Sequence, residues 1–205
     1  MEILPQKLTV NFKNKAMKNF RNSIIILSTL FLLITTISYA QVTTTHPTQS
    51  QPNGQNIISC SAYESITYNG HTIDQINATN GDTSSIQSLL GSYTSATNND
   101  NSWERLFMFG SNRLAFDTEF ERLTIIEIID SQWPVKILGK EIRVGDHFNE
   151  LKQKFGNDLK IIYKPEINPN YVVSFNCLEN DYDGTLIDIN VTTNTVEEII
   201  YFINP

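Results

Sequence analysis

Seven segments of the chain combine β-branched and aromatic residues with stretches in which apolar and polar positions alternate. Both features are typical of β-strands. Turn sequences separate neighbouring segments, with Gly110-Ser111-Asn112 in the first group and Asp183-Gly184 in the second. We therefore expect two groups of antiparallel strands, each connected as a meander. The segments are ERLFMFG (104–110), RLAFDTE (113–119), LTIIEII (123–129), LKIIYK (159–164), YVVSFNC (171–177), TLIDINV (185–191) and VEEIIYFI (196–203).

A short helix is predicted ahead of each group of strands. Before the second group, Phe148, Leu151 and Phe155 have the spacing of one helical face. Asp146 is a good N-cap for this helix, and Gly156 is a good residue to end it.

Before the first group, Ser84 and Gln87 match a capping box, and Gly91 follows the apolar stripe formed by Ile86, Leu89 and Leu90. Each helix has two to three turns, which is marginal in isolation, so both must pack on a sheet.

The two halves have a similar order of elements. Gly70 and Ile73 match Gly139 and Ile142, and Gly91 matches Gly156 if the first half carries an insertion near INATNG. The pattern predicts an α+β fold with one curved antiparallel sheet and short helices on one face, built from two tandem helix-plus-meander units.

The repeated string I-x-x-G-[DM]-x-x-x-x-[VL]-x-x-x-[FL]-G resembles the tandem units of β-lactamase-inhibitor-protein-like domains and the single unit of SmpA/OmlA-type envelope lipoproteins. The resemblance covers about residues 68–203, but the chain has no lipobox cysteine and at most one disulfide. It implies a non-catalytic exported module that binds proteins through the sheet face opposite the helices. The residues that match the motif in the second copy are Ile142, Gly145, Asp146, Leu151, Phe155 and Gly156. The first copy matches it, with altered spacing, at Ile73, Gly81, Asp82, Ile86, Leu90 and Gly91.

The N-terminus has the three parts of an export signal. A basic region precedes an apolar stretch from Ile24 to Tyr39, and Ser38-Tyr39-Ala40 places small residues where a signal peptidase reads them. We therefore expect residues 1–40 to be removed, with Met17 as a possible true start. An uncleaved membrane anchor is the alternative, although the apolar stretch is short for a spanning helix.

The rest of the chain divides into a linker and one compact domain. Residues 41–56 are rich in Thr, Gln, Pro and Asn without apolar periodicity, which predicts a flexible linker. Residues 57–205 have the length of a single domain. Trp133-Pro134 marks the boundary between a first repeat, 57–133, and a second repeat, 134–205.

Net charge excludes some partners. The whole chain has 15 Lys and Arg and 22 Asp and Glu; residues 1–40 hold five and one of these, so the remainder has 10 and 21, a net charge of −11. Nucleic acid and anionic lipid require clustered positive charge, so neither is expected as a partner. We expect the partner to be another exported or envelope protein. This chain itself is not expected to insert into a membrane after signal cleavage. The oligomeric state stays open.

The chain has two cysteines, Cys60 and Cys177. In an oxidising compartment they predict one disulfide, and two buried thiols are the alternative. Because the bridge would close a loop of more than a hundred residues, the chain-entropy model gives it roughly 4 to 5 kcal/mol.

Catalytic and metal-binding patterns are weak, and we expect no cofactor. Glu179, Asp181 and Asp183 match the first half of a calcium loop, but a hairpin turn explains the same residues. His71 and His147 each lie near an aspartate, and we interpret both as surface histidines.

Partner contacts are predicted at an aromatic set: Trp103, Phe107, Phe109 and Tyr171. Phe107 and Phe109 share one face of their strand, and Leu106 and Met108 share the other. Both faces are apolar, so one meets the helices and the second is either a binding surface or covered by another part of the chain. The alternative function is a small cone-shaped α+β ligand-binding protein or enzyme, whose pocket would hold Asp117 or Glu127.

Export predicts a mature N-terminus at Gln41. Intact-mass measurement of the protein from its native host should give the mass of residues 41–205. A mass that retains residues 17–40 would contradict cleavage at this site.

Overall fold

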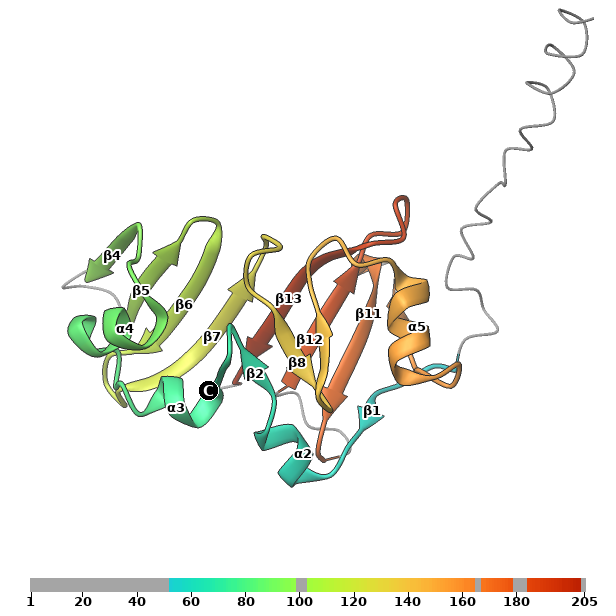
Figure 1. Cartoon of the computed structure of the whole chain (residues 1–205), viewed down its shortest axis with the longest axis horizontal. Helices are drawn as coiled ribbons and strands as arrows, with labels where there is room; N and C mark the ends of the chain where they lie inside the picture. The colour runs from blue at the N-terminus through green and yellow to red at the C-terminus, as the bar shows by residue number, and fades with distance from the viewer. Residues whose placement is uncertain (1–51, 99–102, 165–166, 179–183, 204–205) are drawn as a thin grey trace, which may run out of the picture. The chain divides into compact units, whose positions relative to one another are not determined.

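The computed structural model describes residues 52–98, 103–164, 167–178 and 184–203 (Figure 1). This part of the chain has an α+β fold of mostly antiparallel strands and short helices. Two layers enclose one core: a large sheet, and a second layer made of the helices and a small sheet.

The large sheet joins two antiparallel meanders. The described strands follow the order β1-β11-β12-β13-β7-β6-β5-β4, and β10 also pairs with β11. The meanders meet where β7 pairs with β13, through partners such as Ile128 and Ile199. Strand β1 is parallel to β11. The bounds are β1 Asn56–Ile57, β4 Ser95–Asn98, β5 Glu104–Phe109, β6 Asn112–Asp117, β7 Arg122–Ile128, β10 Ile162–Lys164, β11 Asn168–Asn176, β12 Gly184–Ile189 and β13 Val196–Phe202.

The small sheet joins two short hairpins. β2 (Thr67–Tyr68) and β3 (His71–Thr72) form the first, and β8 (Val135–Ile137) and β9 (Lys140–Ile142) form the second. The hairpins pair antiparallel through β2 and β8, which gives the order β3-β2-β8-β9. Each hairpin comes shortly before a helix and a meander in the sequence, so elements of both halves meet in both sheets.

The seven predicted strands correspond to β5, β6, β7, β10, β11, β12 and β13. The Gly110-Ser111 turn joins β5 to β6 as expected, whereas the Asp183-Gly184 turn includes a residue outside the described ranges. The polar strand β4 and the two-residue strands of the small sheet have no periodic signal, so the sequence does not indicate them.

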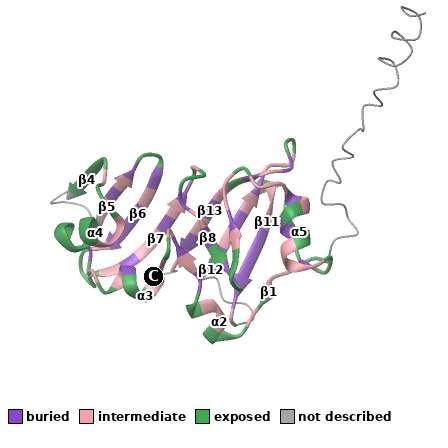
Figure 2. Cartoon of the chain, in the orientation of Figure 1, coloured by how far each residue is buried: buried purple, intermediate pink, exposed green. Residues whose placement is uncertain are grey.

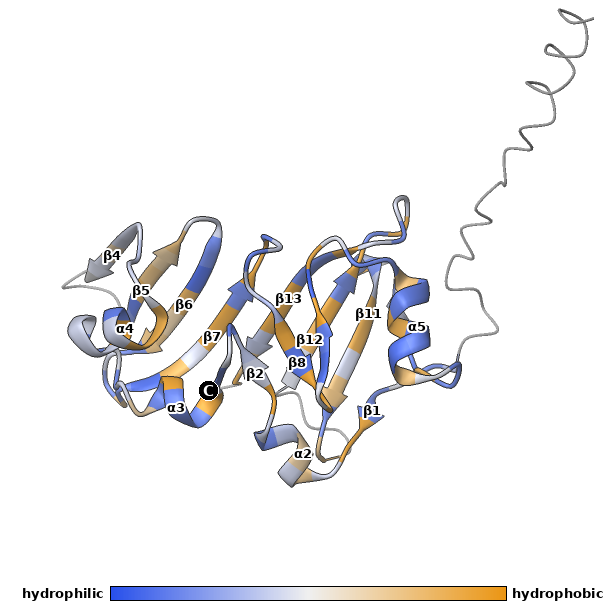
Figure 3. Cartoon of the chain, in the orientation of Figure 1, coloured by the Kyte–Doolittle hydropathy of each residue, from blue (hydrophilic) through white to orange (hydrophobic). Residues whose placement is uncertain are grey.

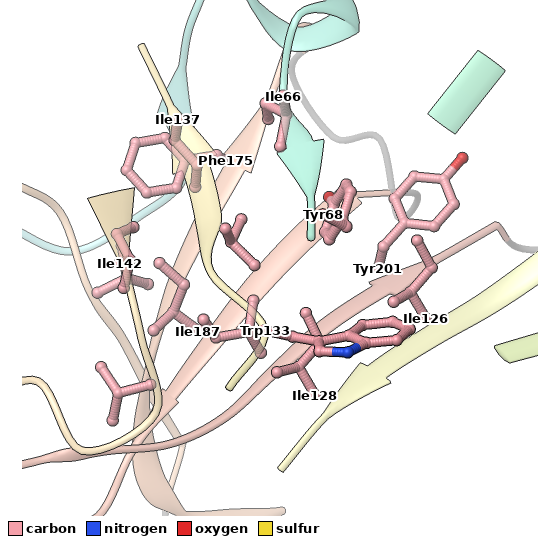
Figure 4. Close-up of a cluster of buried hydrophobic side chains, with 14 of the residues drawn as sticks. Ile66, Tyr68, Ile126, Ile128, Trp133, Ile137, Ile142, Phe175, Ile187 and Tyr201 are labelled. Atoms are coloured by element: carbon pink, nitrogen blue, oxygen red, sulfur yellow. The ribbon is translucent and has the colours of Figure 1, made fainter. Parts of the chain in front are cut away.

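The core lies on one face of the large sheet. Side chains at alternate positions, such as Phe107, Leu114 and Ile126, are fully buried and belong to one apolar cluster. Figure 2 shows buried segments along these strands and exposed segments on α4 and α5. Figure 4 shows where the layers meet: Ile66, Tyr68, Trp133 and Ile137 face Ile126, Ile128, Ile187 and Tyr201.

Contacts place the second layer on this face from β6 to β11. Near one end, the backbone of Gly81 lies so close to Phe116 on β6 that a Cβ would be 2.9 Å from its Cγ. At the other end, the Phe155 ring is 5.1 Å from the Phe175 ring on β11. Between them, the hydroxyl of Tyr68 on β2 hydrogen-bonds that of Thr185 on β12.

The helices are α2 (Cys60–Glu64), α3 (Ile73–Asn77), α4 (Thr83–Leu90) and α5 (Phe148–Phe155). α4 and α5 are the two predicted helices. Gly91 and Gly156 end them with φ of +89° and +105°, in the region that favours glycine. α5 alternates hydrophilic and hydrophobic residues along its turns, as Figure 3 shows, which fits a helix lying on the core.

The predicted helix caps need correction. His147, not Asp146, caps α5, and its Nδ1 accepts a hydrogen bond from the Asn149 N–H. Asp82, not Ser84, caps α4 by accepting from the Ser85 N–H. A capping box is present on α3, between Thr72 and Gln75. Because several polar residues precede each helix, the sequence does not decide which one adopts the extended cap conformation.

The cysteines form the predicted disulfide. Cys60 begins α2 and Cys177 follows β11, with their Cα atoms 4.7 Å apart. The bond attaches the segment before the first hairpin to a strand of the second meander, 117 positions away.

The last residues of the predicted linker are part of the fold, which corrects the expected boundary. The Ile161 N–H donates to the Pro52 carbonyl, and the Gly54 N–H donates to the Ile161 carbonyl. Asn56 belongs to β1, and its side chain bonds to the backbone of Lys160 and Ser174. These hydrogen bonds hold residues 52–56 at the sheet edge, although the composition is that of a linker.

The alternation in β5 gives a paired test of the fold. Phe107→Ala should lower the free energy of unfolding by about 3–5 kcal/mol, because Phe107 is fully buried. Met108→Ala should cost about 1 kcal/mol or less, since the neighbouring side chain points to the other face and is half-exposed. Urea denaturation measures both. Equal losses for the two variants would contradict this assignment of the faces.

Candidate functional site: the open face of the large sheet

One face of the large sheet points away from the core. The helices and the small sheet place their apolar side chains on the opposite face. We call the face that points away from the core the open face. Its apolar members are Leu106, Met108, Ala115, Ile125, Val172, Leu186, Ile200 and Phe202, and its central charged members are Arg113, Glu127, Asp188 and Glu198.

The strand register arranges one apolar row across the open face. Leu106 pairs with Ala115, Ala115 pairs with Ile125, and Ile125 pairs with Phe202. The row therefore crosses β5, β6, β7 and β13. Except for Ala115, which is fully covered by its surroundings, these side chains are half-buried on a face that has only partial cover.

The next row places charges between apolar side chains. Met108 pairs with Arg113, Arg113 with Glu127, and Glu127 with Ile200, which in turn pairs with Leu186. The Arg113 Nε and the Glu127 Oε2 form a salt bridge. The row runs from β5 to β12 through this ion pair.

A third row adds two carboxylates. Glu198 on β13 lies directly opposite Asp188 on β12, and Asp188 pairs on its other side with Val172. The Asn168 Nδ2 donates to both Asp188 oxygens, at 3.0 and 3.2 Å. Three carboxylates thus lie on adjacent strands, and Arg113 is the cation that pairs with one of them.

This arrangement raises the pKa of two of the acids, Glu198 and Asp188. Partial burial, then the hydrogen bond and charge of Glu127, and then the charge of Asp188 raise the pKa of Glu198 to about 7, while Arg113 acts in the opposite direction. Burial is also the main cause that raises the pKa of Asp188, and the charge of Glu197 adds to it; hydrogen bonds from Asn168 and Asn170 oppose the change.

The structure corrects half of the predicted aromatic set. Phe107 is fully buried, with its ring edge-to-face against Phe116 and Tyr93. Phe109 is 8% exposed, and its ring centroid lies 4.9 Å from that of Trp133. Their strand turns this face to the second layer, so neither side chain is available to a partner.

Trp103 and Tyr171 do not form one surface. Trp103 is 74% exposed just before β5, where its carbonyl accepts from the Thr118 N–H. Tyr171 lies on β11, which four strands separate from β5, and points to the core side, where its ring packs at a tilt against that of Tyr163 with centroids 4.7 Å apart. The predicted set is therefore divided among the core, one strand end and one sheet edge.

The two acids proposed for an enclosed pocket lie elsewhere. Asp117 accepts hydrogen bonds from the Glu119 and Phe120 N–H groups and so stabilises a turn. Glu127 is on the open face, in its salt bridge. Depressions of about 550 and 460 Å³ lie beside α5 and beside α3, respectively, and both are lined mainly by polar residues and are open to solvent.

The remaining candidates have structural roles or lie outside the described residues. His147 caps α5, and its Nε2 lies 3.3 Å from the Asn194 Nδ2. The possible calcium ligands 179, 181 and 183 fall in a range that the structure does not describe. Within the ranges it does describe, no three His, Cys, Asp or Glu side chains are placed to hold a metal ion.

No helix in the described ranges has both the length and the apolar character needed to cross a membrane. Comparison of the chain with protein-family models, with curated proteins and with solved structures gives no significant match. The fold and its open face are therefore the basis for inferring a function.

The raised pKa of Glu198 predicts a pH-dependent stability. The folded state holds this proton up to about pH 7, whereas the carboxyl's ordinary pKa is 4.5. Folding therefore takes up a proton between these values, and the contribution of Glu198 to stability falls as pH rises through this window. Glu198→Gln should raise the melting temperature at pH 8 more than at pH 5.

Glu119→Gln, in an exposed turn, is the matched control and should show no such difference. Thermal unfolding followed by circular dichroism measures both variants. The same change at both pH values for Glu198→Gln would contradict the inferred interaction of the carboxylates.

Proposed function

We propose that this chain is an exported, non-catalytic binding module that docks another exported or envelope protein on its open face. One observation carries the proposal: among the five neighbouring strands β12, β13, β7, β6 and β5, all except β6 hold large apolar side chains at outward positions, around a small charged group. Residues that lie on the solvated face of an antiparallel sheet are usually polar.

The composition of the open face resembles a protein-binding surface more than an ordinary solvated one. Leu106, Met108, Ile125, Leu186 and Phe202 are half-buried without a described covering element. Contiguous apolar surface of this kind marks interaction sites on proteins. Polar and charged groups among the apolar ones add specificity, because a partner that leaves them unpaired binds poorly.

Export supports this choice of partner class. We infer that residues 1–40 are a cleaved signal, on the basis of the basic region, the apolar stretch and Ser38-Tyr39-Ala40. The Cys60–Cys177 disulfide is consistent with an oxidising compartment. The partner would then be a protein of the same compartment.

We further infer that the fold consists of two tandem units. Each half contains a hairpin, a glycine-terminated helix and a four-strand meander, in that order. The last strands of the meanders pair with each other, and so do the hairpins through β2 and β8. The first half also has α3, in the insertion near INATNG. Joining two units extends the open face beyond what one meander offers.

Site-directed photo-crosslinking in the native host tests the binding role. A photoreactive amino acid at Met108 or Leu186 should crosslink the exported protein to a discrete partner. The same group at the exposed positions Gln87, on α4, and Leu138, in the β8–β9 turn, should not, because both belong to the second layer. Crosslinks from the two second-layer positions alone would contradict the choice of face.

The affinity of the crosslinked partner is then measured after the partner has been purified. Leu186→Ser combined with Ile200→Ser should weaken its binding at least about tenfold, while Leu138→Ser leaves it unchanged. Circular dichroism confirms that each variant stays folded. Unchanged affinity for the folded double variant would refute binding through the open face.

A further inference from the structure

We propose that the open face recognises a cationic protein surface, which inserts a lysine or arginine side chain among Glu127, Asp188 and Glu198 while its apolar neighbours pack on the surrounding rows. This rests on the proposed binding role and specifies the chemistry of the partner. The inference comes from the mismatch of charge on the face combined with the half-buried apolar side chains around it.

The placement of the acids breaks a rule of strand pairing. Asp188 and Glu198 lie directly opposite each other on β12 and β13, and like charges in this position destabilise a sheet. Glu127 lies close enough to Glu198 to hydrogen-bond its carboxyl. Arg113 pairs with Glu127, which leaves an excess of negative charge at the centre of the open face.

A cation from outside would remove this mismatch. At neutral pH, Glu198 is partly protonated because its charged form is disfavoured by burial and by the neighbouring carboxylates. A lysine or arginine placed among the three acids favours their charged forms, so binding at this point releases a proton. The relief of repulsion is then available only to a partner of the right charge.

The surroundings of the acids suit a long basic side chain. Ile200 and Leu186 lie beside the carboxylates in the neighbouring row, and Met108 lies beyond Arg113. Lysine and arginine can lay their aliphatic stems on apolar surface and keep their charged ends at polar groups. A guanidinium can in addition bind a carboxylate with two parallel hydrogen bonds.

Charge disfavours the other possible occupants. A second copy would bring the same acidic centre against itself around a two-fold axis. Residues 41–51 of this chain contain neither lysine nor arginine. Nucleic acid and anionic lipid surfaces carry the same sign as the cluster. A cationic protein is the occupant that satisfies both the apolar rows and the carboxylates.

Titration with defined peptides tests the proposal on the protein purified after export. The probe is an acetylated, amidated nine-residue peptide that alternates lysine with leucine. Control peptides replace each lysine by glutamate, or each leucine by serine. In NMR titrations of the ¹⁵N-labelled protein, the lysine–leucine probe should shift amides of β7, β12 and β13, and both controls should bind at least about tenfold more weakly.

The carboxylates are tested by a combined variant, Glu127→Gln, Asp188→Asn and Glu198→Gln. It should lower the affinity for the lysine–leucine probe at least about tenfold in calorimetry at pH 8. The matched control, Glu64→Gln, Glu119→Gln and Glu121→Gln, removes the same charge from exposed positions and should bind like the unchanged protein. Affinity of the unchanged protein should be weaker at pH 5.5 than at pH 8, because Glu198 is then protonated.

The outcomes separate this proposal from the proposed function. Equal losses in the two triple variants, shifts confined to other strands, or equal binding of the glutamate peptide would overturn the cationic partner. Suppose that Leu186→Ser with Ile200→Ser abolishes binding of the crosslinked partner but the carboxylate variant does not. Binding through the open face is then supported, and recognition of a cationic side chain is refuted. Concentration-dependent dimerisation that the carboxylate variant strengthens would point to a second copy and also overturn it.

Discussion

The pairing of β7 with β13 is the interaction on which the rest of the structure depends. It joins the last strands of two meanders, so that the sheet is continuous from β4 to β11. On one face it brings Ile126 and Ile128 beside Ile199 and Tyr201 in the core. On the other it brings Glu127 next to Ile200 and close to Glu198. One set of backbone hydrogen bonds thus determines both the shared core and the charged centre of the open face. Either meander alone, with its own hairpin and short helix, would bury less of its surface and be marginal.

The two faces of the large sheet differ in what packs against them. The core face is closed by aromatic contacts between layers, such as Phe155 with Phe175 and Phe109 with Trp133, and by the buried hydrogen bond of Tyr68 with Thr185. The open face keeps apolar side chains and opposed carboxylates without a described covering layer. An arrangement that costs stability in the isolated fold is expected where a surface serves binding. The disulfide fixes the segment before the first hairpin to β11 and so helps to hold the second layer on the core face.

The candidate site was only partly predictable, and β5 shows why. Its sequence places Phe107 and Phe109 on one side and Leu106 and Met108 on the other, and both sides are apolar. Alternation identifies the two sets but not which one the second layer covers. The larger aromatic side chains are in the core, and the flexible aliphatic ones are outside. The carboxylate cluster was not predicted at all, because Glu127, Asp188 and Glu198 are far apart in sequence and meet through strand pairing.

The sequence by itself determined the local structure: seven strands from their alternation, two helices from their apolar stripes and from Gly91 and Gly156, and a disulfide from its two cysteines. These features depend on residues within one turn or one strand, or on the number of cysteines. Only the tertiary structure decided the order of the strands, the small sheet of β2, β3, β8 and β9, the inclusion of residues 52–56 and the choice of the core face. Each of these depends on backbone or side-chain contacts between segments distant in the chain, and the strands of the small sheet, with two or three residues each, are too short to carry a periodic signal.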